Sequence, residues 1–269
     1  MPRLYQSAKN AFSKTYIYLS LFSAVITIIG IIGYEKMIDN LLYRIILVVV
    51  LFIGSYIVAL IVCYFRSNVS IKLGNDRILV VEYDDLFSKQ GVVVIPFNRF
   101  FDTAVNDKIL NEHSVAGQFI KNCFAGNLEE LDKQISLALN NVEPDYTSSK
   151  PGKENAYPIG TVVKVQKGAN QYFCVAQTDV DSDFKSKCDI EMLHKTMMEI
   201  LKFINKEANG RKVYMPLLGA GFSRLNKEKQ VILEYLVSIL KTADIPLQSE
   251  LHIVLREAER GSIDLAKCL

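Results

Sequence analysis

The stretch best suited to chemistry is residues 215–225, which read MPLLGAGFSRL. A short β-branched and aromatic run precedes it and a helical pattern at 226–241 follows, so we expect a strand, a glycine turn and a helix. Gly219, Ala220 and Gly221 leave almost no side chain at the turn, so backbone N–H groups can approach a ligand, and the helix N-terminus adds its positive dipole end. This arrangement favours a phosphate or diphosphate, although a lone G-x-G is as typical of a turn that only redirects the chain.

The elements that must position this turn follow from the hydrophobic pattern. We expect strands at 69–73, 78–83, 92–96, 160–166, 171–177, 212–217 and 251–255, and helices at 114–124, 127–140, 189–208 and 226–241. Residues 143–158, rich in Pro, Ser and Lys, are expected to form a mobile loop. The order predicts an α/β fold, a three-layer α/β/α sandwich with a mixed sheet. Ligands in such folds bind at the carboxyl ends of the strands, here the loops 83–87, 96–117 and 217–225.

Two uncharged runs, 15–34 and 45–65, precede these elements. Each is long enough to cross a hydrocarbon core of about 30 Å as a helix. A cleaved signal peptide and a buried core hairpin are the alternatives, but the first run is too long for a signal peptide and a second span follows at once. Lys and Arg flank the outer ends of both runs, which places both termini in the cytoplasm. We therefore expect a two-helix transmembrane hairpin at 1–66 and a cytoplasmic domain at 67–269.

The charge balance limits the classes of partner. Residues 1–66 hold six Lys/Arg and two Asp/Glu, a net charge of +4, which leaves 25 against 27, a net charge of −2, for residues 67–269. A nearly neutral domain without a basic stripe argues against nucleic-acid binding.

The residues that could bind metal are few and scattered. The five cysteines form no C-x-x-C pair, so in a cytoplasmic domain we expect free thiols without disulfide or zinc, and there are only three histidines. Asp179, Asp181 and Asp183 alternate, but the glycine and distal glutamate of a calcium-binding EF-hand loop are missing, so a solvated loop is expected.

Three loops at the expected site resemble those of a macro domain, the ADP-ribose-binding module. YDDLF at 83–87 resembles the family's Gly-Asp-Ile segment, and Asp85 matches the aspartate that receives the adenine amino group. VVIPFN at 93–98 resembles the strand that ends in Asn-Ala-Ala-Asn, and Asn98 matches the last asparagine, which contacts the distal ribose. SVAG at 114–117 and GAGFSR at 219–224 resemble the two phosphate loops, with Phe222 near the distal ribose.

The resemblance gives a set of expected ligand contacts, although Asp84, Ile95 and Pro96 depart from the family pattern in a way that favours binding over hydrolysis. Phe101 could cover the ligand or be ordinary core, and Asp102 could polarise a ribose or cap its loop. The full set is Asp85, Asn98, Phe101, Asp102, Ser114, Val115, Ala116, Gly117, Leu218, Gly219, Ala220, Gly221, Phe222, Ser223 and Arg224.

A macro domain behind two transmembrane helices resembles the membrane effectors of type II Thoeris anti-phage defence. The resemblance implies that a TIR-domain enzyme makes histidine-ADP-ribose from NAD, that the macro domain binds this signal and oligomerises, and that the helices disrupt the bacterial inner membrane. It implies neither a cofactor nor a metal, and because His113 lacks a nucleophile–base set around it, no catalytic residue is expected. The alternatives are a membrane-anchored ADP-ribose glycohydrolase or deacylase, and a membrane scaffold that binds no ligand.

Overall fold

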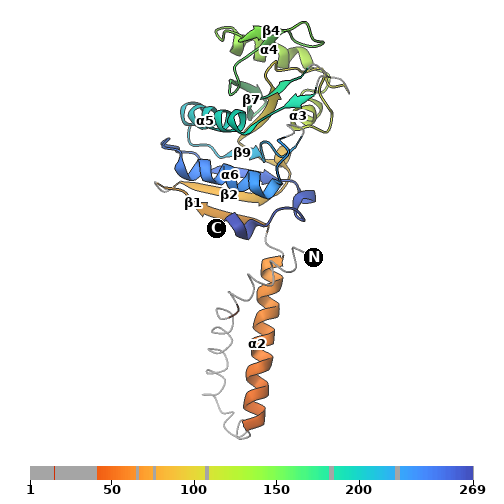
Figure 1. The fold of residues 1–269 in the computed structure, drawn as a ribbon. Coiled ribbons are helices and arrows are strands. Elements are labelled where there is room, and N and C mark those ends of the chain that lie inside the picture. The colour runs from red at the N-terminus through yellow and green to blue at the C-terminus, as the bar shows by residue number, and fades with distance from the viewer. Residues whose placement is uncertain are drawn as a thin grey trace. The chain divides into compact units, whose positions relative to one another are not determined.

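The computed structural model describes residue 15 and residues 41–64, 67–74, 77–106, 109–181, 185–221 and 225–268 of the 269-residue chain. By its internal contacts the chain divides into two compact units, Met1–Ser67 and Asn68–Leu269. The first contains the helix α2 (Leu41–Tyr64), and the second contains every strand that the structure describes (Figure 1).

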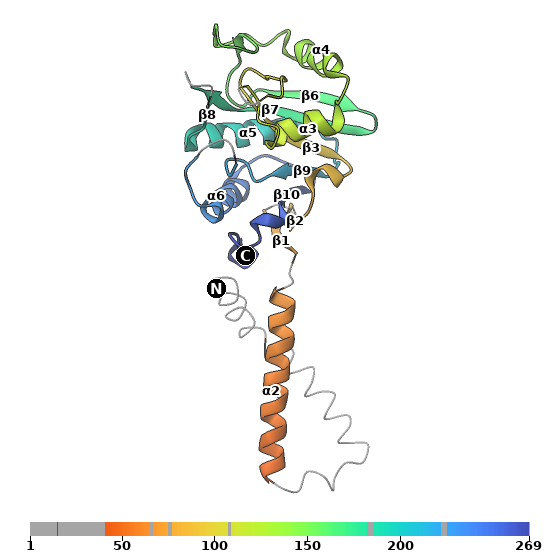
Figure 2. The same cartoon turned by 90° about the vertical axis from the view of Figure 1, so that its right-hand side faces the viewer.

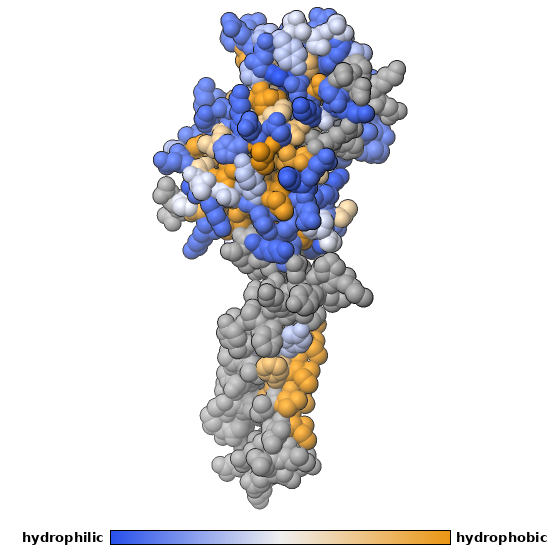
Figure 3. Space-filling model, in the orientation of Figure 1, coloured by the Kyte–Doolittle hydropathy of each residue, from blue (hydrophilic) through white to orange (hydrophobic). Residues whose placement is uncertain are grey.

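The helix α2 has 24 residues, among which Arg44 is the single charge and proline is absent. Several of its large apolar side chains are exposed, for example Ile46 at 48%, Val50 at 58% and Ile57 at 50%, and Figure 3 shows apolar side chains along this helix. Taken over the described residues alone, no helix is both long and apolar enough to cross a membrane. Only residue 15 of the run 15–34 is described, so the transmembrane hairpin stays a prediction.

A mixed sheet forms the middle layer of the second unit, in the order β1-β2-β10-β9-β3-β7-β6, with β8 paired to the end of β7. Five central strands, β2, β10, β9, β3 and β7, run parallel, and β1 and β6 are antiparallel edge strands. The bounds are β1 Asn68–Lys72, β2 Ile78–Tyr83, β3 Val92–Asn98, β6 Val162–Lys167, β7 Asn170–Val180, β8 Ser186–Lys187, β9 Val213–Pro216 and β10 Leu251–Leu255. The predicted mixed sheet is confirmed.

Helices cover both faces of this sheet. α3 (Val115–Cys123) and α4 (Leu128–Leu139) pack on one face, and α5 (Ile190–Glu207) and α6 (Lys229–Thr242) pack on the other (Figures 1 and 2). The side chains of β3 alternate between these faces, with Val92 and Val94 toward α5 and α6 and Val93 and Ile95 toward α3 and α4. Such two-sided burial explains the continuous apolar run at 92–95.

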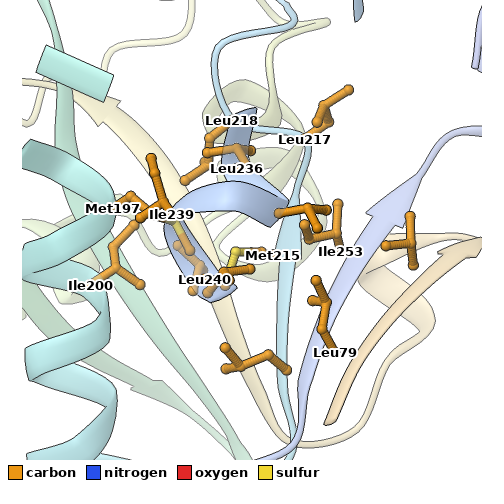
Figure 4. Packing of buried hydrophobic residues seen from close by; sticks show 14 of the residues in the cluster. Leu79, Met197, Ile200, Met215, Leu217, Leu218, Leu236, Ile239, Leu240 and Ile253 are labelled. Carbon is orange, nitrogen blue, oxygen red and sulfur yellow. The ribbon is translucent and has the colours of Figure 1, made fainter. Parts of the chain in front are cut away.

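The core between the sheet and α5/α6 is built mainly from aliphatic side chains and methionines. Figure 4 shows Met197 and Ile200 of α5 and Leu236, Ile239 and Leu240 of α6 near Leu79, Met215 and Ile253 of the sheet. The three-layer α/β/α sandwich is therefore confirmed.

The exposed edge of the sheet at β6 is capped by a side chain. Gln134 of α4 donates from Nε2 to the Gln166 carbonyl oxygen at 3.0 Å and accepts from the Gln166 N–H at 2.8 Å. One carboxamide thus satisfies both backbone groups of an edge residue, as a neighbouring strand would.

The segment 143–158 is more ordered than the sequence indicated. It contains a two-stranded hairpin, β4 (Tyr146–Thr147) with β5 (Asn155–Ala156). Between these strands, the Lys150 ammonium forms a buried ion pair with Asp102 at 2.7 Å. This long-range contact is invisible in the local composition on which the loop prediction depended.

The helix after the glycine turn begins later than predicted. α6 starts at Lys229, whereas the pattern had indicated Asn226. Asn226 has φ of 51°, a left-handed conformation that a right-handed helix cannot include. The glycine turn therefore does not lead directly into a helix N-terminus.

The three cysteines whose state the structure records, Cys123, Cys174 and Cys188, are free, as expected. Burial raises the pKa of the Cys174 thiol and raises that of Cys188 to about 11. Both are therefore protonated at neutral pH and behave as small apolar side chains.

Thr196 on the buried face of α5 allows a stability prediction. It is fully buried, and its hydroxyl has no hydrogen-bond partner among the described residues. Because a buried unpaired hydroxyl is costly, Thr196→Val should raise the free energy of unfolding by about 1 kcal/mol. The matched control is Thr103→Val, which removes a hydroxyl that bonds Asp132 at 2.7 Å and should lower that free energy. Urea denaturation of the full-length protein in detergent, followed by circular dichroism, compares them; a less stable Thr196→Val variant would contradict the prediction.

Candidate ligand-binding site

A cavity of about 790 Å³ lies at the carboxyl ends of the parallel strands. Its wall contains residues at or just after the ends of β2, β3, β7, β9 and β10, together with the start of α3. The ends of β2 and β7 are four strand spacings apart, or about 19 Å at about 4.8 Å per spacing. The cavity thus extends across the sheet at the edge where ligands bind in open α/β folds, and its size suits a nucleotide-sized molecule.

Two carboxylates lie at the β2 end of the cavity. Asp84 accepts hydrogen bonds from the Lys89 ammonium at 2.6 Å and from the Asp85 N–H at 2.7 Å, and the bond from Lys89 lowers its pKa. Asp85 caps the short helix η2 (Leu86–Ser88) through Oδ1, which accepts from the Phe87 N–H at 3.0 Å. Within the described residues no partner binds Asp85 Oδ2, so this oxygen can accept a hydrogen bond from a ligand.

The start of α3 supplies backbone donors to the cavity. Ser114 is the N-cap: its hydroxyl donates to the Asn111 carbonyl at 2.7 Å and accepts from the Gly117 N–H at 3.0 Å. Val115 and Ala116 occupy the first turn, where N–H groups lack intrahelical acceptors, and both line the cavity. These donors, with the helix dipole, make the α3 start suited to an anion.

Gly117 supports this turn without facing the cavity. A Cβ there would lie 2.3 Å from the Asn111 carbonyl oxygen, so only glycine allows the chain at 111 to pack against the first turn of α3. Its N–H is taken by Ser114, and it is absent from the cavity wall. In the structure, the predicted site residue Gly117 thus meets a packing requirement next to the cavity wall.

The glycine turn after β9 forms another part of the wall, through Leu218, Gly219, Ala220 and Gly221. The Ala220 N–H donates to the Leu217 carbonyl at 3.3 Å, which closes the turn. Gly219 has φ of 85°, a conformation that favours glycine. Phe222, Ser223 and Arg224, the rest of the predicted loop, lie outside the described residues.

Asn98 ends β3 in the cavity wall, as expected, and its side chain also fixes the loop that follows. Its Oδ1 accepts from the N–H groups of Phe100 and Asp102 at 3.1 and 3.3 Å, and its Nδ2 donates to the Asp102 carboxylate at 3.0 Å. Asp102 is 1% exposed and also binds the Lys150 ammonium and the Lys153 N–H, each at 2.7 Å. Asp102 therefore anchors the β4–β5 hairpin, and this predicted site residue is absent from the cavity wall.

Phe101 also lies outside the cavity wall. It is fully buried, and its ring packs 6.0 Å from that of Phe97 and 6.1 Å from that of Tyr157, measured between centroids. Its φ of 52° belongs to the tight turn after β3 that Asn98 holds together. Its position agrees with the alternative of ordinary core.

The structure thus unites nine of the predicted contacts in one cavity: Asp85, Asn98, Ser114, Val115, Ala116, Leu218, Gly219, Ala220 and Gly221. It adds residues that sequence reasoning missed, at the end of β7, around β8 and after β10: Gln177, Thr178, Lys185, Ser186, Arg256, Glu257 and Glu259. No local motif marked these positions, because they reach the cavity only through the placement of β7 beside β3 and of β10 beside β2.

The segment after β10 is held in place by ion pairs. Glu259, 5% exposed, accepts from the Arg256 N–H at 3.1 Å, from its guanidinium at 3.2 Å and from the Lys229 ammonium at 3.0 Å. These bonds fix the helix η3 (Glu257–Glu259) against α6, so this part of the wall is built before a ligand arrives.

The titratable side chains in the cavity wall include His113 and the carboxylates of Asp84, Asp85, Glu257 and Glu259. The His113 side chain is 78% exposed, and its Nε2 lies 3.5 Å from Glu112 Oε1 at the surface. Among the residues that the structure describes, no cluster of His, Cys, Asp and Glu could hold a metal ion.

Comparisons with known proteins identify the family. The family model described as Thoeris protein ThsA, Macro domain, matches residues 79–256. Thoeris protein ThsA of Bacillus amyloliquefaciens (strain Y2) is 26% identical over 187 residues, 66% of this chain, and the match spans 61% of that relative. Among solved structures, a variant of the Oceanobacillus iheyensis macrodomain is 14% identical with a TM-score of 0.50, over 76% of this chain and 96% of that one.

Another variant of that macrodomain, with ADPR, is 13% identical with a TM-score of 0.50, over 75% of this chain and 96% of that one. At such identities these likenesses show the fold alone. The family model is more specific, and it extends from β2 to the residue after β10 and so includes nearly the whole cavity wall. The chain therefore belongs to the family of Thoeris protein ThsA macro domains.

Proposed function

We propose that this protein is a membrane-anchored receptor and effector of bacterial anti-phage defence, which binds an ADP-ribose-derived signal, histidine-ADP-ribose, in the cavity of its macro domain. One observation carries the proposal. Two turns with small side chains, the start of α3 and the turn at 218–221, line the same cavity as the carboxylate of Asp85. A diphosphate needs backbone N–H groups, and an adenine amino group needs an acceptor.

We propose that each part of the ligand lies at a different strand end. Adenine binds at the β2 end, where Asp85 Oδ2 accepts from its amino group and Leu86, Phe87 and Val254 supply apolar wall. The diphosphate binds between the α3 start and the turn after β9. The distal ribose then lies at the end of β3, beside Asn98.

Signal binding, not turnover, is the activity that we propose. His113 lines the cavity, but its side chain is mostly exposed and lies 3.5 Å from Glu112 at the surface. The buried thiols Cys174 and Cys188 are not part of the cavity wall, and their raised pKa leaves both protonated. The proposal requires neither a cofactor nor a metal.

The effector part of the proposal involves the membrane. The uncharged runs at 15–34 and 45–65 and the exposed apolar side chains of α2 support insertion into the inner membrane, with both termini in the cytoplasm. A TIR-domain enzyme supplies the signal. Two helices from one chain cannot enclose a pore, so signal binding must drive formation of a homo-oligomer that disrupts the bilayer. Nucleic acid is not a partner on this proposal.

The adenine contact can be tested by exchanging the base. Wild-type protein should bind ADP-ribose at least tenfold more tightly than inosine diphosphate ribose, which has a carbonyl in place of the amino group, because a carboxylate hydrogen bond contributes about 1.5–3 kcal/mol. Asp85→Ala should weaken ADP-ribose binding and abolish the discrimination. Calorimetry on the full-length protein in detergent measures both.

Asp84→Ala is the matched control for that experiment, since its carboxylate is already bound by Lys89 and the Asp85 N–H. It should keep the preference for adenine. If wild-type protein bound ADP-ribose and inosine diphosphate ribose equally well, adenine would not bind at Asp85. If calorimetry showed no binding of either ligand, only the alternative of a membrane scaffold would remain.

The two loop glycines should respond differently to a methyl group. Gly117→Ala places Cβ 2.3 Å from a backbone oxygen, so it should lower the melting temperature and weaken ligand binding together. A Cβ at Gly221 lies within 4 Å of no heavy atom of the described residues, and Gly221 has no positive φ, so Gly221→Ala should leave the melting temperature unchanged while its methyl group obstructs the cavity. Thermal unfolding with and without ADP-ribose separates these effects. A Gly221→Ala variant that unfolds earlier would show a structural role for this turn.

Assembly should depend on the signal. Light scattering in detergent should show growth in particle mass on addition of histidine-ADP-ribose, and liposomes that carry the protein should release a trapped dye under the same conditions, since the ligand must favour the assembled state. Asp85→Ala should show neither response at the same concentration. Conversion of the added ligand to product at a rate that follows protein concentration would favour the alternative of a hydrolase.

A further inference from the structure

Gln177 occupies an irregular position near the end of β7. The register between β3 and β7 shifts there, since Phe97 pairs with Ala176 and Asn98 pairs with Thr178. Gln177 is therefore an extra residue with no partner on β3, the arrangement of a β-bulge. Bulges redirect a side chain and are frequent next to binding sites.

The side chain of Gln177 is buried with an unused donor. The residue is 2% exposed and lines the cavity, and its amide nitrogen Nε2 has no hydrogen-bond partner at normal distance among the described residues. A weak hydrogen bond from the Gln177 side chain to the Cys188 sulfur lowers the pKa of that thiol, against the larger rise from burial, and a protonated thiol is a weak acceptor that leaves the amide donors largely unused. A buried amide without a strong partner is costly, so its presence in a cavity wall points to a partner that arrives with a ligand.

The place of Gln177 in the sheet indicates which part of the ligand this is. Asn98 pairs with Thr178 across β3 and β7, so Gln177 lies one strand beyond the residue expected at the distal ribose. Asp85, at the opposite end, is about 19 Å away by strand spacing. Thr178, the next residue along β7, and Ser186 of β8, which pairs with Val180, also line the cavity and make this end polar.

We infer that Gln177 is the residue that selects for a group attached to the distal ribose, and that this group presents a hydrogen-bond acceptor, such as a carboxylate or a ring nitrogen, to the Gln177 amide N–H. The inference rests on the proposed function, because it takes the bound molecule to be an ADP-ribose derivative with adenine at Asp85. The signal is then distinguished from plain ADP-ribose at the β7 end of the cavity, and the bulge exists to place this donor.

The test compares two ligands on three forms of the full-length protein in detergent. Gln177→Met keeps the length of the side chain and removes the donor. It should weaken binding of histidine-ADP-ribose by about tenfold, the value of one lost hydrogen bond in a buried site, and leave ADP-ribose binding within about twofold. Because the unpaired amide is removed, the melting temperature of the ligand-free protein should not fall.

Gln118→Met is the matched control. Gln118 also lines the cavity, but its amide nitrogen is already bound to the His113 carbonyl oxygen at 2.9 Å. This variant should leave the ratio of the two affinities unchanged.

The outcomes separate the inference from the function on which it rests. If wild-type protein binds both ligands and Gln177→Met weakens both equally or neither, the cavity binds ADP-ribose derivatives and Gln177 does not select among them. A lower melting temperature of ligand-free Gln177→Met would likewise overturn the inference, since it would show a structural partner for the amide. If wild-type protein binds neither ligand, the proposed function itself fails.

Discussion

The parallel pairing of β2, β10, β9, β3 and β7 is the constraint on which the site depends. Hydrogen bonding in a parallel ladder makes all five strands end at the same edge, whatever their separation in sequence. Asp85 and Gly219 are 134 positions apart in the chain, yet both follow strands of this set and line one cavity. The helices cover both faces of the sheet, so the surface available to a ligand is formed by the loops at the carboxyl edge.

A second requirement is that the loops form enough internal hydrogen bonds to hold their shape and still leave some N–H groups for a ligand. At the start of α3, the Ser114 hydroxyl accepts from the Gly117 N–H, and the other N–H groups of the first turn are left for a ligand. Lys89 forms an ion pair with Asp84, and Asp85 uses only one carboxylate oxygen for its helix cap. Asn98, Asp102 and Lys150 form a buried polar chain that ties the loop after β3 to the β4–β5 hairpin. Within such a network each member is supported by the next, so the wall at Asn98 is rigid without a ligand.

The fold was largely predictable from the sequence because its strands are strongly marked. The runs at 78–83 and 251–255 match β2 and β10 to the residue, and the alternation of strands and helices was sufficient to indicate the layers. Part of the site was predictable for the same reason, since glycines and small residues after a strand constrain the backbone there. Contacts between residues far apart in the chain could not be predicted from the sequence. The roles of Phe101 and Asp102 depend on Tyr157 and Lys150 about fifty positions away, and Gln177 reaches the cavity through a bulge that has no sequence signature.

The carboxamide of Gln134 bears on how copies of this chain can come together. An edge strand with free N–H and C=O groups invites a strand from another molecule, and β6 would otherwise offer such an edge. At Gln166 both groups are already taken by Gln134, so an incoming strand would have to displace a side chain held at two points. Uncontrolled sheet extension along β6 is thereby discouraged in a protein whose activity, on our proposal, depends on self-association only when a signal is present. Contacts between copies would then have to be made by other surfaces, under the control of the bound ligand.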